Sequence, residues 1–325
     1  MATADERYFY LDAGPADRRR VREVIRLKSA IVAATMLLLC IGGEARGRTW
    51  YVYPNGVGGD APTIQAAVDS AAASGDKILL RAGVYRETGI VVDGKALLID
   101  QVDGQAYLRS PSPGSGVCIT ARNVSSGFSL NSLSFRGFET AIALENTAGY
   151  VQWPTLRDCG RGVSISGGLS AVTVWFALID SCGTGVEVNG GAAIVLQNLT
   201  IAHCETGVAF GGGSSTFARS IVYGCSTGAS CAGGAAAPSC NDYFLNGADY
   251  AGCAPGATDF YSDPMFCFAV APSPGLYWLH AASPCFTGAD PNPCGVRCGA
   301  LITAAGCTGT AIEETSWGAV KALYR

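Results

Sequence analysis

The side chains that could do chemistry are few and lie mainly in the middle of the chain. The acidic and basic candidates are Asp158, Asp180, Glu187 and His203. Two carboxylates can act as acid and base on a glycosidic bond, and a histidine can transfer protons near neutral pH. The competing interpretation is that all four are solvated surface or turn residues.

Two tryptophans could bind a ligand instead. Trp153 and Trp175 are 22 residues apart. A tryptophan ring has a flat apolar face and a polar edge, which suits contact with the face of a sugar ring, so both are candidate carbohydrate-binding residues. Packing inside the protein is the alternative, because the two rings differ by one residue in their place relative to the repeat described next.

The middle of the chain repeats itself about every 22 residues. In each copy an apolar residue precedes a cysteine by three positions and a glycine follows it by three. Apolar or small residues then alternate with other side chains, which predicts a short strand with one buried face. The clearest copies are LRDCGRGVSI (156–165), IDSCGTGVEV (179–188), IAHCETGVAF (201–210) and VYGCSTGASC (222–231).

A unit of this length, with short strands and no helix signal, predicts an all-β solenoid in which each coil stacks on the last. Weaker copies near 89–92, 116–119 and 135–144 bring the number of coils to about seven or more. We place the repeated glycine at a corner between strands. Equal positions then form columns, and we expect one inward column of buried thiols, with a solvent-facing column as the alternative: Cys159, Cys182, Cys204 and Cys225.

Composition restricts the class of protein. The 325 residues include 49% hydrophobic and only 15% charged side chains, which excludes a disordered chain. The formal net charge of −4 and the lack of a basic block after the first thirty residues argue against nucleic-acid binding. No apolar run reaches the roughly 18 residues that a membrane-spanning helix needs.

The N-terminus has the layout of a secretory signal peptide. Basic residues between Arg18 and Lys28 precede the apolar stretch AIVAATMLLLCIGG (30–43), and small residues follow. We predict a signal peptide over residues 1–47 and a secreted or cell-envelope protein, with an uncleaved anchor helix as the alternative. The remaining chain has 14 basic and 20 acidic side chains, a net charge of −6.

Export would place the cysteines in an oxidising compartment, where disulfides persist. Thirteen of the 14 cysteines follow the predicted signal peptide, and eight of them lie between Cys231 and Cys307. We predict disulfides in this region, of unknown pairing. A zinc site at Cys294 and Cys298 is the alternative, although the chain has only two histidines and no second matching cysteine pair.

Residues 63–74 predict a helix that covers the first coil. Thr63 is a suitable N-cap, and four residues share one face: Ile64, Ala67, Val68 and Ala71. We expect a break at residues 75–76, followed by buried strand residues over 78–80 and 83–85.

The stretch TWYVYPNGVGGDAPTIQAAVDSAAASGDKILLRAGVYRE (49–87) resembles the opening of right-handed parallel β-helix proteins of the pectin-lyase-like superfamily, secreted bacterial type. The segments DPMFC (263–267), LYWLHAASPC (276–285) and CGALITAAG (298–306) are similar to the end of such proteins. The resemblance implies a single-stranded right-handed parallel β-helix over about residues 49–307. It implies little about activity, because the superfamily includes lyases, hydrolases, esterases, epimerases, adhesins and proteins with no assigned role.

The resemblance also implies what an active site would contain. Hydrolases of the superfamily use clustered Asp residues with a His and a basic residue, and lyases commonly bind calcium and use an Arg or Lys as base. This sequence has no paired Asp or Gly-His-Gly motif and little sign of a carboxylate row at outward positions. A site built from irregular turns around 100–115, with Asp100, Asp103 and Arg109, would revive the enzyme interpretation.

We divide the chain into five parts: a signal peptide (1–47), an N-terminal strand and capping helix (48–84), β-helix coils (85–232), Cys-rich C-terminal coils and cap (233–307), and a tail (308–325). The tail could form a short amphipathic helix that docks on the coils or on an anchoring partner. A frayed terminus is the alternative.

The sequence thus favours a secreted or cell-surface β-helix protein that is non-catalytic and either binds polysaccharide or acts as an adhesin-like spacer. The alternative is a polysaccharide lyase or glycoside hydrolase with an unrecognised active site. We expect a monomer whose partner is a polysaccharide or cell-surface glycan and not a nucleic acid. We expect no metal or cofactor, unless the protein is a lyase that uses calcium.

Overall fold

The computed structural model describes residues 47–191, 193–233, 235–267, 277–286 and 292–300. The four clear copies of the repeat fall within these ranges. Residues 1–46 of the predicted signal peptide and the whole predicted tail lie outside the described residues.

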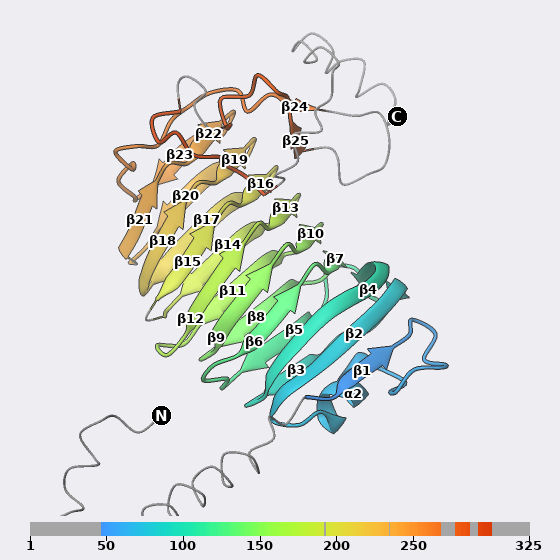
Figure 1. The fold of residues 1–325 in the computed structure, drawn as a ribbon. Coiled ribbons are helices and arrows are strands. Elements are labelled where there is room, and N and C mark those ends of the chain that lie inside the picture. Colours follow the sequence, from blue (N-terminus) through green and yellow to red (C-terminus); the bar gives the residue numbers. More distant parts are fainter. Residues whose placement is uncertain (1–46, 192, 234, 268–276, 287–291, 301–325) are drawn as a thin grey trace, which may run out of the picture. The chain divides into compact units, whose positions relative to one another are not determined.

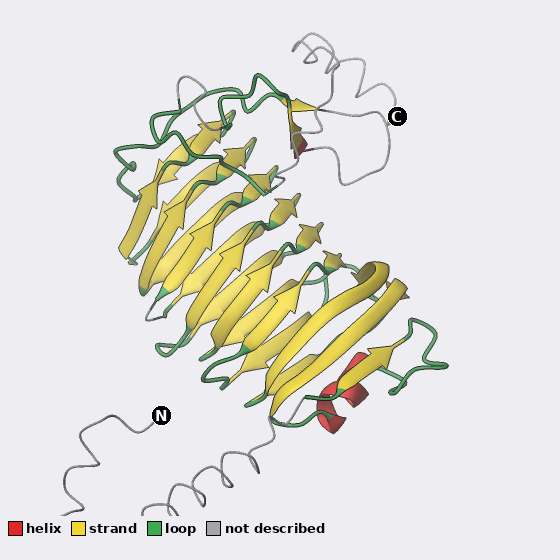
Figure 2. Ribbon diagram, in the orientation of Figure 1, coloured by secondary structure: helices red, strands yellow, loops and turns green. Residues whose placement is uncertain are grey.

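The described chain is a parallel β-solenoid, as the repeat predicts (Figure 1). Each regular coil contributes one short strand to each of three rows, and the strands of a row pair in parallel with those of the coils before and after. Strands make up nearly all of the regular structure (Figure 2). No helix in the described ranges is long and apolar enough to cross a membrane.

We number the rows in the order in which the chain passes through them. The first row holds β6 (Phe128–Asn131), β9 (Ala148–Gln152), β12 (Ala171–Trp175), β15 (Ile194–Gln197), β18 (Ser214–Ala218) and β21 (Ala235–Ser239). The second row holds β7 (Ser134–Arg136), β10 (Thr155–Arg157), β13 (Leu178–Asp180), β16 (Thr200–Ala202), β19 (Ile221–Tyr223) and β22 (Asp242–Phe244). The third row holds β3 (Ile90–Asp93), β5 (Val117–Arg122), β8 (Thr140–Glu145), β11 (Arg161–Ser166), β14 (Thr184–Asn189), β17 (Thr206–Gly212), β20 (Thr227–Cys231) and β23 (Ala248–Ala251).

Longer strands begin the solenoid. β2 (Ser74–Tyr85) pairs with β1 (Thr49–Val52) and with β4 (Ala96–Arg109). Because β4 pairs with both β6 and β7, it starts the first row and the second row together. These two rows are therefore parts of one 15-stranded sheet, and the third row is a separate eight-stranded sheet.

A short helix, α2 (Ile64–Ser70), lies at the N-terminal end of the solenoid and contacts β1, β2 and β3 (Figure 1). Thr63 is its N-cap, as predicted, and the Thr63 hydroxyl accepts a hydrogen bond from Ala66 N. The predicted helix end at residue 74 is wrong, because α2 ends at residue 70.

The predicted break at residues 75–76 is also wrong, because both residues lie within β2. The Asp76 carboxylate explains the early end of the helix. It accepts hydrogen bonds from Ala72 N at 2.9 Å and from Trp50 Nε1 at 3.0 Å, and so ties the chain that leaves α2 to β1 and β2. The Trp50 hydrogen bond outweighs burial and lowers the pKa of Asp76, which keeps the carboxylate charged.

Residues with a left-handed backbone form the corners between rows. The corners from the first row to the second have φ between 51° and 58°: Ser132, Trp153, Phe176, Asn198, Arg219 and Cys240. The corners from the second row to the third are Gly137, Asp158, Ser181, His203, Gly224 and Leu245. A left-handed backbone is unfavourable for residues other than glycine. Its recurrence in coil after coil indicates that the hydrogen bonds between coils hold it in place.

The repeated glycine is not a corner, contrary to the sequence prediction. Each copy is the second residue of a third-row strand: Gly162, Gly185, Gly207 and Gly228. A Cβ on Gly185 would lie 2.5 Å from the carbonyl oxygen of Gly207 in the next coil. Close approach of the neighbouring coil therefore explains this glycine, and not a turn of the chain.

The cysteine column is buried, as predicted. Its four members expose only 2–3% of their surface and are free thiols: Cys159, Cys182, Cys204 and Cys225. The thiols of the neighbouring coils and burial raise the pKa of Cys159 and of Cys204, which keeps both protonated. The column thus packs as small apolar side chains along one edge of the core.

The C-terminal segment, which we define as the described residues from 252 to 300, folds over the outer side of the second row. Its β24 (Phe266–Cys267) and β25 (Trp278–Leu279) form an antiparallel pair. Together with outward side chains of the second row it forms a separate apolar cluster: Leu178, Ala202, Ile221, Tyr223, Phe260, Phe266, Tyr277, Leu279, Cys285, Cys298 and Ala300. The second row is therefore covered from β13 to β19.

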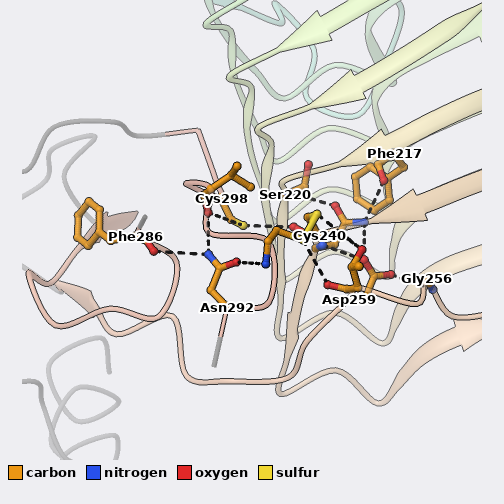
Figure 3. Close-up of a disulfide and its surroundings, with 12 residues drawn as sticks. Phe217, Ser220, Cys240, Gly256, Asp259, Phe286, Asn292 and Cys298 are labelled. Atoms are coloured by element: carbon orange, nitrogen blue, oxygen red, sulfur yellow. Dashed lines mark hydrogen bonds between the residues drawn. A yellow bond between two sulfur atoms is a disulfide. The ribbon is translucent and has the colours of Figure 1, made fainter. Parts of the chain in front are cut away.

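Disulfides join this segment to the coils. Cys231–Cys253 links β20 to the chain that follows β23, and Cys240–Cys294 links a corner of the last coil to the C-terminal segment (Figure 3). Cys267 is also disulfide-bonded. The alternative of a zinc site at Cys294 and Cys298 is wrong, because Cys294 is bonded to Cys240 and Cys298 is a free buried thiol.

The neighbourhood of the second disulfide is a dense hydrogen-bond network (Figure 3). The Asp259 carboxylate accepts hydrogen bonds from Asn241 N at 2.8 Å and from Gly256 N at 3.1 Å. Asn241 in turn donates to the carbonyl oxygen of Phe217 in the preceding coil at 3.0 Å. The turn that follows the last coil is thereby anchored to the solenoid without a regular strand.

We expect Gly185→Ala to destabilise the solenoid, because the new Cβ would meet the Gly207 carbonyl oxygen at 2.5 Å and the Ile201 side chain at 2.9 Å. Overpacking of this kind costs about 1–3 kcal/mol and lowers the midpoint of thermal unfolding. Gly168→Ala is the matched control, since a Cβ there meets nothing within 4 Å. Circular dichroism melting curves with the same midpoint for the two variants would contradict the packing role of the glycine column.

Asp242, the first residue of β22, is fully buried. Its carboxylate accepts hydrogen bonds from Ser262 N at 3.0 Å and from the Cys285 thiol at 3.1 Å. Burial raises the pKa of Asp242 to about 7. The folded protein therefore keeps a proton that the unfolded chain releases near pH 3.9.

The free energy of unfolding should accordingly fall as the pH rises from about 4 to about 8, by at most about 4 kcal/mol from this group. Asp242→Asn carries no charge at either pH and should remove that part of the fall. Chemical denaturation of both proteins at the two pH values measures the difference. If the stability of the Asn variant falls as steeply as that of the wild type, Asp242 does not carry the effect.

Candidate functional site

Four aromatic side chains gather on the outer side of the first row at β9 and β12, and we name them the aromatic patch: Tyr150, Trp153, Trp175 and Phe176. Tyr150 and Trp175 alternate with buried valines and so point outward from their strands. Trp153 and Phe176 are the corner residues that follow these strands. Tyr150 and Trp153 are each 48% exposed, so both side chains are accessible to solvent.

The rings of the patch contact one another across two coils. Trp153 stacks on Phe176 with ring centroids 5.7 Å apart and an interplanar angle of 6°. The Trp175 ring contacts both Tyr150 and Phe176. Its centroid lies 6.3 Å from that of Tyr150 and 6.4 Å from that of Phe176. The Trp153 backbone N also donates a hydrogen bond to the Trp175 carbonyl oxygen at 2.9 Å. The rings are thus held in place before a ligand arrives, which reduces the entropy lost on binding.

Amide side chains flank the patch. The strand register places Trp175 directly between Gln152 of β9 and Gln197 of β15, and Asn131 of β6 is the next residue in line. An amide donates and accepts hydrogen bonds, as a sugar hydroxyl does. The surface therefore combines flat apolar rings with groups that suit a hydroxylated ligand.

Both predicted tryptophans lie in the patch, but at different positions of the coil. Trp175 is a strand residue opposite Gln152, whereas the counterpart of Trp153 is the corner residue Phe176. The one-residue offset seen in the sequence therefore does not send either ring into the core. Trp175 Nε1 is covered and has no hydrogen-bond partner among the described residues.

The sequence analysis missed Tyr150 and Phe176. A signal for Phe176 was present, because it follows Trp153 by 23 residues, the same interval that separates Cys159 from Cys182. Tyr150 offers a weaker signal, since it is identified only once the outward positions of β9 are known.

A second cluster joins Asp180 and His203 at the border of the C-terminal segment. His203 Nδ1 lies 3.3 Å from Asp180 Oδ1, and the Tyr277 hydroxyl donates a 2.7 Å hydrogen bond to the same oxygen. Arg157 lies 3.8 Å from the other carboxylate oxygen. Burial acts to raise the pKa of Asp180, but the hydrogen bonds of His203 and Tyr277 and the charges of His203 and Arg157 outweigh it and lower this pKa.

This pair has the arrangement of a proton-transfer site. A carboxylate that holds Nδ1 of an imidazole leaves Nε2 free to accept or donate a proton. The His203 side chain is 38% exposed, whereas that of Asp180 is only 14% exposed. Of the four predicted acid–base residues, only Asp180 and His203 contact each other through their side chains.

The carboxylates of the other two candidates have different partners, although Asp158 N donates a 3.2 Å hydrogen bond to the Asp180 carbonyl oxygen. Asp158 is a corner residue whose carboxylate accepts a 2.6 Å hydrogen bond from Arg136. Glu187 lies in the third row, on the other side of the corner from Asp180, and pairs with Arg161 at 3.2 Å. The structure therefore does not bring the four residues into one site.

The sequence analysis expected irregular turns around residues 100–115. This prediction is wrong for residues 100–109, because Asp100, Asp103 and Arg109 all lie within β4. Asp103 pairs with Arg81, and the Arg109 guanidinium lies 5.9 Å from the centre of the Tyr107 ring. Among the described residues, no group of three or more His, Cys, Asp or Glu side chains could hold a metal ion.

Comparison with known proteins adds one similarity. No family model and no curated protein matches the chain. An alginate lyase from Paenibacillus sp. str. FPU-7 has a crystal structure that is similar over 62% of this chain and 77% of that chain, with 15% sequence identity and a TM-score of 0.43. A likeness of this extent says nothing about the activity of this protein.

Tyr277→Phe should loosen the C-terminal segment, because it removes a hydrogen bond to the charged Asp180 carboxylate. A hydrogen bond to a charged group contributes about 1.5–3 kcal/mol. We expect faster amide hydrogen exchange over residues 277–286 and 292–300 in this variant. Tyr261→Phe is the control, since Tyr261 belongs to the same segment and is 53% exposed. Exchange rates that are equal in the two variants would show that the Tyr277 hydroxyl does not hold the segment.

Proposed function

We propose that the protein is a secreted polysaccharide-binding protein whose aromatic patch contacts the faces of sugar rings. The observation that carries the proposal is the exposure of the Tyr150 and Trp153 rings, in contact with Trp175 and Phe176, on the outer side of a continuous sheet. Exposed apolar side chains that form a group, and are not scattered singly, indicate a binding surface.

The chemistry around the rings supports a sugar as the ligand. Gln152 and Gln197 lie on either side of Trp175, and amides can exchange hydrogen bonds with hydroxyl groups as donors and as acceptors. Strand and corner backbones fix all four rings, which suits recognition of a rigid ring. The disulfides of the last coil support an oxidising location outside the cytoplasm.

Polysaccharide cleavage is the second candidate function, and the contact between Asp180 and His203 favours it. Phe176 of the patch directly precedes Ala177 and the three-residue strand β13, and Asp180 ends that strand. The acid–base pair and the aromatic patch therefore lie on neighbouring rows of the same part of the solenoid. A lyase would use His203 as the base that removes a proton from a sugar carbon next to a carboxylate.

Trp153→Ala and Trp175→Ala should each weaken polysaccharide binding about tenfold or more, because each removes a ring of the patch. Affinity electrophoresis in gels that contain soluble polysaccharides measures the binding. Tyr261→Ala is the control, since it removes an aromatic side chain that is 53% exposed but lies in the C-terminal segment. Circular dichroism of each variant shows whether the solenoid is intact.

The same mixtures should be assayed for reducing ends and for unsaturated sugar products. Binding without turnover, lost in the tryptophan variants and kept in Tyr261→Ala, is the expected result. Turnover that disappears in His203→Gln would replace the binding proposal with the cleavage candidate. Equal binding by all three aromatic variants would overturn the role of the patch.

A further inference from the structure

We propose that the aromatic patch takes an uncharged polysaccharide, and that the bound chain lies across the strands, along the direction in which the coils stack. The inference rests on the proposed polysaccharide-binding function and adds the class of the ligand and its direction. Three features of the described residues carry it: the charge of the outward positions, the pairing of the nearby cations, and the line of amides through Trp175.

The outward positions of the first row around the patch are uncharged. The register arranges them in two columns that run from β6 to β18. One column holds Ser129, Tyr150, Thr173, Val195 and Thr216, and the other holds Asn131, Gln152, Trp175, Gln197 and Ala218. A carboxylate or sulfate bound here would lose hydration and gain no cation in return, which is unfavourable.

Close to the patch, the cations of the neighbouring second row lie beside carboxylates. Arg136 donates to Asp158 at 2.6 Å, and Arg157 lies 3.8 Å from Asp180. In the corner column that contains the patch, the nearest cation is Arg219, two coils beyond Phe176. Each cation in the two coils that form the patch therefore already has a carboxylate within 4 Å, which would compete with a bound polyanion.

The charge of the whole chain points the same way. Its formal net charge is −4, and this negative field disfavours the approach of a polyanion. A neutral polysaccharide meets no such barrier, and its binding depends on ring contacts and hydrogen bonds that salt barely screens.

The line of amides gives the direction of the chain. Asn131, Gln152, Trp175 and Gln197 occupy the same position in four consecutive coils. Consecutive coils are about 4.8 Å apart, a step comparable with the length of one sugar unit. A chain that crosses the strands would meet two amides, the Trp175 ring and a third amide in succession. A chain that follows β12 would instead leave Trp175 for Thr173 and Ala171.

Two oppositely charged substitutions at one position test the charge of the ligand. Gln197→Lys and Gln197→Glu are made in the full-length protein, with Ser230→Lys and Ser230→Glu in the third row as matched controls. The probes are soluble mixed-linkage β-glucan, glucomannan and xylan as neutral polymers, and polygalacturonate and alginate as acidic ones. Dissociation constants are measured by affinity electrophoresis at low and high NaCl.

We expect at least one neutral polymer to bind, and both Gln197 variants to weaken this binding by a similar factor of about 2 to 10, because each loses the amide hydrogen bonds. The sign of the new charge and the NaCl concentration should make little difference, and the Ser230 variants should bind as the wild type does. Binding that Gln197→Lys strengthens and Gln197→Glu weakens, or binding of acidic polymers alone, would overturn the inference.

The two proposals fail in distinguishable ways. If only acidic polymers bind, and Trp153→Ala abolishes that binding, then the polysaccharide-binding function stands and the uncharged ligand is wrong. If none of the five polymers binds, both proposals fail.

The direction of the chain has its own test. Gln152→Ala, in the coil before Trp175, should weaken binding by a factor of about 2 to 10. Ala171→Leu adds bulk on the same strand as Trp175 and should leave binding unchanged. If Ala171→Leu weakens binding more than Gln152→Ala does, the chain follows the strand and the proposed direction is wrong.

Discussion

Parallel hydrogen bonding between consecutive coils is the constraint on which the rest of this structure depends. Because the coils pair in register, residues at equal positions form columns in which neighbours are about 4.8 Å apart. The side chains of one column must therefore pack against one another without a clash or repulsion. The inward thiols, from Cys159 to Cys225, satisfy this condition as small apolar side chains. The column from Gly162 to Gly228 satisfies it by having no side chain where the next coil approaches. Even the unfavourable left-handed corners recur, because the backbone hydrogen bonds of each coil position those of the next.

The same constraint explains how much of the fold could be predicted from the sequence. Period-two alternation at a 21- to 23-residue interval predicts strands, coils and an inward cysteine column, and the structure contains them. The role of the repeated glycine could not be predicted in this way. A glycine that turns the chain and a glycine that lets another backbone approach look alike in one sequence. Only the position of the Gly207 carbonyl oxygen relative to Gly185 distinguishes the two.

The candidate site was less predictable, because it depends on which outward columns remain exposed to solvent and which the C-terminal segment covers. In the second row, the C-terminal segment covers apolar outward residues, as at Leu178 and Ile221, and also polar ones, as at Thr200. The polarity of a residue in this row therefore does not reveal whether it is covered. The contact between Tyr277 and Asp180 joins residues 97 positions apart, outside the period of the repeat. Repeat analysis could place Asp180 on a strand and His203 at a corner, but it had no means of bringing Tyr277 to them.

The first and second rows also differ in how they accommodate charged side chains. A column of identical charges on successive coils is unfavourable, because each charge lies about 4.8 Å from the next. The second row meets this problem at two of its arginines by pairing them with a carboxylate of the following coil, Arg136 with Asp158 and Arg157 with Asp180. The first row avoids it, because its outward columns hold amides, hydroxyls and rings around Trp175. A surface built in this way can extend over many coils without repulsion, and it matches a polymer whose own repeating units carry hydroxyl groups and no charge.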